Sequence, residues 1–189
     1  MDQNCELRVN GKFVFGIIVA ATLARVFSPP VLGHPSNFAP IAAISLFSGA
    51  TLCGLARYIV PLGAILISDM VINFLYVGQF TFFYEGFYWQ YLCYLAIAAF
   101  GTLLRERIGV ASVLGASVLS SIFFFVVSNF GVWFSTPLYP PTSSGLVTCY
   151  LMAIPFFSTT LLGDLFYNSV MFGSWFLASR YLPLTARTA

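Results

Sequence analysis

The stretch GVASVLGASVLSSIFFFVVSNFGVWF, residues 109–134, contains no charged residue. A helix needs about 20 consecutive apolar residues to cross the hydrocarbon core of a bilayer, and this stretch is longer than that. We therefore predict that it spans a membrane. Apolar blocks of similar character lie on both sides of it.

The composition of the whole chain agrees with this prediction. Of 189 residues, 59% are hydrophobic and 7% are charged, whereas an average soluble domain carries about 25% charged residues. The mean hydropathy is +0.91, which would leave a soluble fold without enough polar surface. A water-soluble enzyme or regulator is therefore excluded. The net charge of only +2, with no basic face, also excludes a nucleic-acid binder.

We predict one all-α integral membrane domain over residues 1–189, built as a bundle of six transmembrane helices. The predicted spans are about 12–28, 38–54, 57–78, 87–104, 109–134 and 159–181. The first span ends at Pro29-Pro30, because proline cannot continue a helix. Residues 146–157 are apolar but too short to span, and Pro155 interrupts them. They predict a short interfacial or re-entrant segment that acts as a lid between the fifth and sixth helices.

The positive charges predict the orientation, because Lys and Arg favour cytoplasmic loops. With both termini inside, the outer loops contain no Lys or Arg, and Arg25 alone lies near the outer end of the first helix. The cytoplasmic set is then Arg8, Lys12, Arg57, Arg105, Arg107, Arg180 and Arg187. This distribution predicts a multi-pass protein of a bacterial inner membrane with both termini in the cytoplasm.

Polar side chains inside the spans are candidate functional groups, because an aspartate at a helix centre costs about 2.5–3.5 kcal/mol on insertion scales. Under the predicted topology, polar groups of four helices and the outer loops collect in the outer half of the membrane. An outward-facing binding cavity requires such a collection. The predicted substrate-binding residues are His34, Asn37, Asp69, Asn73, Tyr84, Asn129, Trp133, Tyr139, Asp164 and Asn168.

The charged residues also allow a structural interpretation, in which Arg25 pairs with Asp69 or Asp164 and holds the bundle together. The two interpretations are compatible, since an ion pair can orient groups that touch a ligand. The outer loops 79–90 and 135–144 are rich in aromatic, proline or small polar residues. They are either an aromatic belt at the headgroups or loops that close over a ligand.

The first helix carries Gly16, Ala20 and Ala24 on one face, at every fourth position. Small residues at this spacing let another helix approach closely. The face serves either ordinary packing within the chain or the docking of a separate membrane subunit.

Signals for catalysis are poor. The chain has no Walker-type phosphate loop and no HExxH or clustered Cys/His pattern for a metal, so we predict no catalytic residue and no metal site. Cys5, Cys53, Cys93 and Cys149 are scattered and form no disulfide-rich framework. An acid pair of Asp69 and Asp164 in a membrane enzyme stays open as an alternative.

Four segments resemble a family of small bacterial membrane proteins that is similar to the substrate-capture (S) components of energy-coupling factor (ECF) transporters. They are HPSNFAPIAAISLFSGA (34–50), PLGAILISDMVINF (61–74), SNFGVWF (128–134) and the run from Tyr139 through LLGDLFYNSVMFG, and the resemblance covers about 30–180. It implies a six-helix protein with both termini inside that binds a vitamin or metal ion from the outer side. A separate module of one transmembrane coupling subunit and two ATPases then drives release to the cytoplasm.

The resemblance also implies roles for particular residues. Ala20 and Ala24 match the face that docks the coupling subunit, and residues 138–157 match the segment that closes the site. The loaded subunit topples within the membrane. Among such relatives is a solitary vitamin B12 transporter that coordinates cobalt through a cysteine. Cys93 and Cys149 lie in no motif that matches it, His34 is an alternative imidazole ligand, and cobalamin is one candidate substrate.

The leading prediction is a substrate-binding membrane subunit for uptake of a small nutrient, a vitamin or cofactor precursor, with no intrinsic cofactor. Its partners are the small-molecule substrate, membrane lipid, a transmembrane coupling subunit and ATPases. Two alternatives remain. One is an integral membrane enzyme that acts on a lipid or quinone, and the other is a structural or assembly subunit of a membrane complex.

Overall fold

A computed structural model of the chain describes residues 11–31, 37–80, 83 and 85–181, and over these residues it is all-helical, without a strand. The helices are α1 (Gly11–Val31), α2 (Ile41–Thr51), α3 (Ala56–Val77), α4 (Phe87–Leu104), α5 (Val110–Ser135) and α6 (Ser143–Tyr181). Four of them, α3 to α6, are long and apolar enough to cross a membrane. The all-α prediction is confirmed, and the long apolar helices indicate a membrane-embedded protein.

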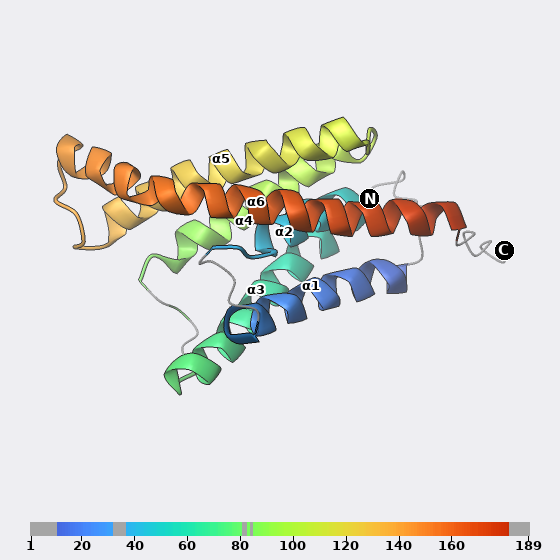
Figure 1. Cartoon of the computed structure of the whole chain (residues 1–189), viewed down its shortest axis with the longest axis horizontal. Coiled ribbons are helices and arrows are strands. Elements are labelled where there is room, and N and C mark those ends of the chain that lie inside the picture. Colours follow the sequence, from blue (N-terminus) through green and yellow to red (C-terminus); the bar gives the residue numbers. More distant parts are fainter. Residues whose placement is uncertain (1–10, 32–36, 81–82, 84, 182–189) are drawn as a thin grey trace.

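The helices surround α2. Figure 1 shows α5 and α6 side by side along the long axis, with α1 and α3 on the other side of the molecule and the short α2 between them. α2 contacts each of the other five helices. The centre of the bundle is therefore occupied by its shortest helix.

α2 is a half-length helix. Its 11 residues extend over about 16 Å, whereas the hydrocarbon core is about 30 Å thick. The predicted second span, 38–54, thus contains a helix that is too short to cross a membrane by itself. Asn37 adopts a left-handed φ of 71° shortly before the helix, and Leu52 is extended directly after it. All eleven residues of α2 are buried, so protein rather than lipid surrounds it.

Two glycines let α2 and α4 cross with their backbones in contact. A Cβ atom on Gly49 of α2 would lie 1.9 Å from the carbonyl oxygen of Ala98. A Cβ atom on Gly101 of α4 would lie 2.2 Å from the carbonyl oxygen of Leu46. Both distances are far below van der Waals contact, so only glycine fits at either position.

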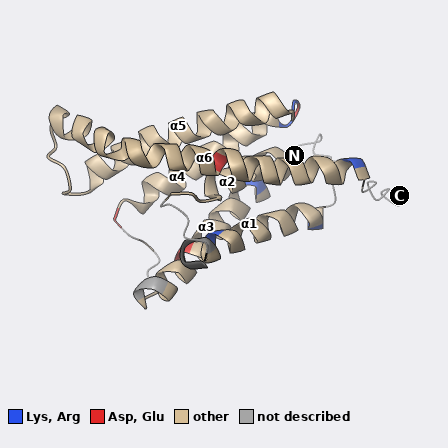
Figure 2. Cartoon of the chain, in the orientation of Figure 1, with Lys and Arg blue, Asp and Glu red and all other residues tan. Residues whose placement is uncertain are grey.

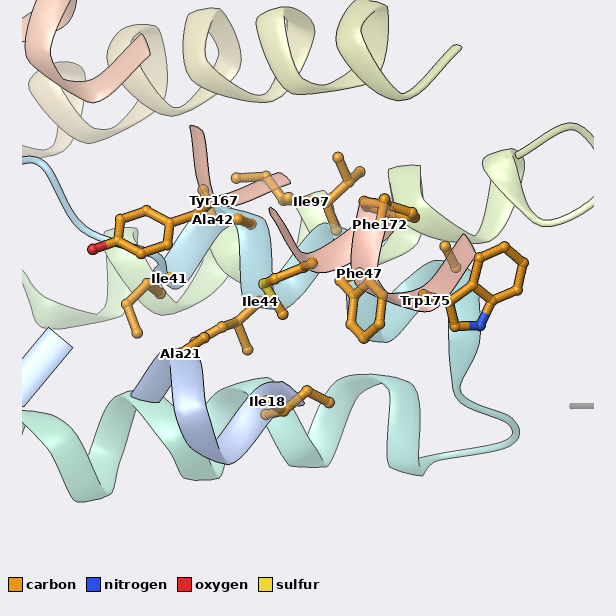
Figure 3. Close-up of a cluster of buried hydrophobic side chains, with 14 of the residues drawn as sticks. Ile18, Ala21, Ile41, Ala42, Ile44, Phe47, Ile97, Tyr167, Phe172 and Trp175 are labelled. Atoms are coloured by element: carbon orange, nitrogen blue, oxygen red, sulfur yellow. The ribbon is translucent and has the colours of Figure 1, made fainter. Parts of the chain in front are cut away.

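The apolar core forms around the same helix. Figure 3 shows Ile44 and Phe47 of α2 among side chains from α1, α4 and α6, including Ile18 and Ile97. The ring of Phe47 meets that of Phe172 edge-on, with centroids 5.1 Å apart. Burial of these side chains on every face of α2 explains why its sequence reads as a continuous apolar run.

The structure of α6 contradicts the prediction of a separate segment between the fifth and sixth helices. This helix runs without interruption through 39 residues, about 58 Å, and includes the whole segment 146–157 that is predicted as a separate interfacial or re-entrant lid. That prediction is wrong because Pro155 removes a single helical hydrogen bond while α5 packs alongside. The Tyr150 hydroxyl donates to the carbonyl oxygen of Val126 at 2.7 Å, and the rings of Phe125 and Phe157 lie 5.0 Å apart.

α1 also runs past its predicted end. The helix includes Pro29 and Pro30 and ends at Val31, three residues beyond the predicted boundary at 28. Each proline removes one hydrogen bond to the carbonyl four residues earlier, and at the last turn only this end of the helix is affected.

Basic residues gather at one end of the bundle. Figure 2 shows most of the Lys and Arg positions near the end where α1 begins and α6 ends. There the Arg105 guanidinium donates to the carbonyl oxygen of Leu52, at the end of α2, over 3.0 Å. The predicted orientation puts this end in the cytoplasm.

The glycine crossing yields a stability prediction. Gly101→Ala should lower the free energy of unfolding by about 1–3 kcal/mol, because the new methyl group overlaps the α2 backbone. Gly115→Ala on α5 is the matched control, since a Cβ atom there meets nothing within 4 Å. The readout is thermal unfolding of both variants in the same detergent. Equal melting temperatures for Gly101→Ala and the unmodified protein would contradict the crossing.

Candidate functional site

A cavity of about 280 Å³ lies at the N-terminal end of α2. A Cβ atom on Gly163 would lie 3.2 Å from the Cα of Phe38, so α2 starts beside the middle of α6. A full-length second span would continue into this space. The cavity thus exists because α2 stops halfway.

The cavity wall combines charged, amide, hydroxyl and aromatic side chains from α1, α4, α5, α6 and the residues around the start of α2. Its lining residues are Arg25, Asn37, Ala39, Ile41, Ala42, Gln90, Tyr94, Phe124, Phe125, Ser128, Asn129, Val132, Ala153, Phe156, Phe157, Thr160 and Asp164. Ligand pockets usually have such a mixture of apolar walls and a few polar groups.

Asp164 is a buried carboxyl group on this wall. Its side chain is only 1% exposed, and Ser121 of α5 donates a hydrogen bond to its Oδ2 at 2.6 Å. Among the described residues, Asp164 forms no ion pair. An acid at such a position in a long apolar helix is a candidate functional group.

Arg25 pairs with Asp69, which is one of the two pairings that the sequence allows. The Arg25 Nη2 atom lies 2.6 Å from Asp69 Oδ1, and Nη1 donates to Ser68 Oγ. The Arg25 and Asp69 side chains are 19% and 13% exposed. Arg25 lines the cavity and Asp69 does not. The pair therefore joins α1 to α3 beside the cavity.

Two of the predicted amides, Asn37 and Asn129, line the cavity. The Asn129 side chain donates to the carbonyl oxygen of Phe125 at 2.8 Å, which holds it along α5. A third amide, Asn168, lies one turn after Asp164 on α6 and does not line the cavity. It is 1% exposed and donates to Ser117 Oγ at 3.0 Å.

Other predicted residues lie away from the cavity. Asp69 and Asn73 are one turn apart on α3, and Tyr139 lies in the loop between α5 and α6. Trp133 donates its ring N–H to the carbonyl oxygen of Pro140 at 3.0 Å, so it stabilises that loop. His34 and Tyr84 fall outside the described residues.

The two buried cysteines, Cys93 and Cys149, do not line the cavity either. Cys93 is 0% exposed within α4, and Cys149 is 2% exposed within α6. The Cys149 thiol faces the carbonyl oxygen of Asn129 at 3.4 Å. Over the described part of the chain, no group of three His, Cys, Asp or Glu side chains could hold a metal ion.

Sequence reasoning missed the aromatic half of the cavity. Its walls include Tyr94, Phe124, Phe125, Phe156 and Phe157. A signal was present on α5 and α6, because a polar residue follows one turn after three of these rings. The pairs are Phe124 with Ser128, Phe125 with Asn129, and Phe156 with Thr160. Residues four apart share a helix face, so each ring lies beside a polar group.

The small-residue face of α1 is partly unused inside the chain. Gly16 and Ala20 are exposed, and a Cβ atom on Gly16 meets nothing within 4 Å. Ala24, in contrast, packs against the core. Over the described residues, the N-terminal part of this face is thus open to another helix.

The ion pair yields a prediction. Asp69→Asn should lower the free energy of unfolding by about 2 kcal/mol, because it leaves a mostly buried guanidinium without its countercharge. The double variant Arg25→Gln/Asp69→Asn should recover part of this loss, since both charges are then absent. Thermal unfolding in detergent measures the two single variants, Asp69→Asn and Arg25→Gln, and the double variant. A double variant that loses the full sum of the single losses would contradict the pairing.

Comparison with known proteins identifies the family of this chain. Neither a curated protein nor a solved structure matches it. A family of unknown function (DUF6580) matches residues 7–185, nearly the whole chain, and the chain therefore belongs to that family.

Proposed function

We propose that the protein is a membrane subunit that captures a small nutrient, a vitamin or cofactor precursor, at the outer side of a bacterial inner membrane. The observation that carries this proposal is the cavity at the N-terminal end of α2. Its wall combines an acid, an Arg, amides and aromatic rings. Most basic residues lie near the end of the bundle where α2 ends (Figure 2), and the cavity at the N-terminal end of α2 is directed toward the opposite end. Under the positive-inside rule that end faces outward.

Release to the cytoplasm then falls to a separate coupling module. The chain carries no Walker-type loop of its own. The open face at Gly16 and Ala20 supports docking of a transmembrane coupling subunit that acts with ATPases. The resemblance to ECF substrate-capture components supports the same division of labour, in which the loaded subunit topples. Cobalamin is one candidate nutrient.

The geometry favours capture over the enzyme alternative. An acid pair acting on a lipid or quinone requires Asp69 and Asp164 at one reacting centre. Asp164 lines the cavity, whereas Asp69 lies outside it and binds Arg25. An assembly subunit, the other alternative, has no need of a cavity with a charged and aromatic wall.

A cavity-filling variant tests the proposal. Native mass spectrometry of the protein, purified in mild detergent, should detect a retained small molecule. Ala153→Trp places an indole in the cavity that Ala153 lines and should abolish retention. Val170→Trp is the matched control on α6, because Val170 is 50% exposed on the outer surface of the helix.

The alternatives predict different spectra. A corrinoid absorbance band in the purified protein would identify cobalamin, and a bound lipid or quinone would favour the enzyme. An empty protein that also binds no member of a vitamin panel would contradict capture and leave the assembly subunit.

A further inference from the structure

The charges around the cavity do not balance. Its described lining contains one guanidinium, Arg25, and one carboxyl, Asp164. Asp69 neutralises Arg25 through the contact of 2.6 Å. From the described part of the chain, Asp164 receives only the hydroxyl of Ser121, which carries no formal charge. The described wall therefore presents one uncompensated acid.

An ionised acid that is 1% exposed needs a positive partner, because burial removes the water that would otherwise stabilise its charge. The N-terminus of α2 lies nearby and contributes a partial positive charge. No side chain makes a capping hydrogen bond there, so Asp164 is not tied to that terminus. Among the residues that the structure describes, none supplies a full positive charge to Asp164.

The aromatic side chains of the cavity wall also favour a positively charged ligand. Tyr94 stacks on Phe124 with ring centroids 5.2 Å apart, and Phe125 meets Phe157 at 5.0 Å. The faces of such rings carry partial negative charge, so they attract cations and also stack on flat rings. The aromatic rings and the carboxylate therefore both favour a flat, positively charged ligand.

We infer that the captured nutrient is a small organic cation with a flat ring, and that Asp164 supplies its countercharge. This inference rests on the proposed capture function and names its substrate class. The cavity volume of about 280 Å³ lies slightly below the usual range of ligand pockets, about 300 to 1,000 Å³, so the ligand must be small. A corrinoid is several times larger than this cavity, so the inference also disfavours cobalamin.

Three probes of one size and shape test the charge preference. Benzamidine is a flat cation, benzamide is its neutral counterpart, and benzoate is the anion. Binding of each to the full-length protein in lipid nanodiscs is measured by calorimetry. We expect benzamidine to bind at least about tenfold more tightly than benzamide, and benzoate to bind most weakly.

Two variants test whether Asp164 and Phe157 cause the preference for the cation. Asp164→Asn keeps an oxygen to accept from Ser121, and should weaken benzamidine at least about tenfold while leaving benzamide unchanged. Phe157→Leu keeps apolar bulk but removes a ring, and should weaken benzamidine about threefold to tenfold. Phe176→Leu is the matched control, since Phe176 lies in a separate apolar groove between α5 and α6.

Several outcomes would overturn the inference. They are equal affinities for the three probes, a preference for benzoate, an undiminished preference in Asp164→Asn, and binding of none of the probes. A neutral or anionic nutrient found on the purified protein would overturn the cationic class and leave capture intact. Loss of probe binding together with an empty purified protein would defeat both proposals.

Discussion

The interruption of the second apolar segment at mid-depth is the constraint on which the rest of the structure depends. A chain inside a bilayer must satisfy its backbone polar groups, and irregular backbone is tolerated there only where protein surrounds it or water reaches it. The residues before α2 are irregular beside the middle of α6, and Asn37 and Ala39 line the cavity. The broken segment and the cavity therefore require each other. Without the cavity, the N–H groups of the first turn of α2, which have no partner within the helix, would be buried away from water.

The remaining helices hold α2 in place and position the polar wall of the cavity at its N-terminal end. Gly49 and Gly101 bring the backbones of α2 and α4 into contact, which prevents α2 from sliding along its axis. Successive turns of α5 and α6 are joined by Ser121 to Asp164 and by Ser117 to Asn168. These two hydrogen bonds fix the rotation of α6 and thereby aim Asp164 at the cavity. The same packing that stabilises the fold thus orients the group that we assign to the ligand.

Hydropathy predicts part of this structure and not the rest. The predicted spans 87–104 and 109–134 lie within one residue of α4 and α5, because charged and glycine-containing turns bound them. It cannot predict that α2 stops short, since a helix buried in protein is as apolar as one exposed to lipid. Nor does it distinguish Phe124 and Phe157 in the cavity wall from lipid-facing aromatics. Asp164 and Asn129 stood out because polar groups in spans are rare; the cavity's aromatic residues did not, because aromatic residues are common there.

The central claim is that a water-accessible cavity opens to the outer side above α2. Thr160 lines that cavity, and Thr160→Cys places a thiol in it. The most direct measurement is labelling of this thiol by a membrane-impermeant maleimide, applied to spheroplasts and to inside-out vesicles, against the unmodified protein as background. The account predicts labelling above background from the outside only. Labelling only from the cytoplasmic side, or from neither side, would contradict it.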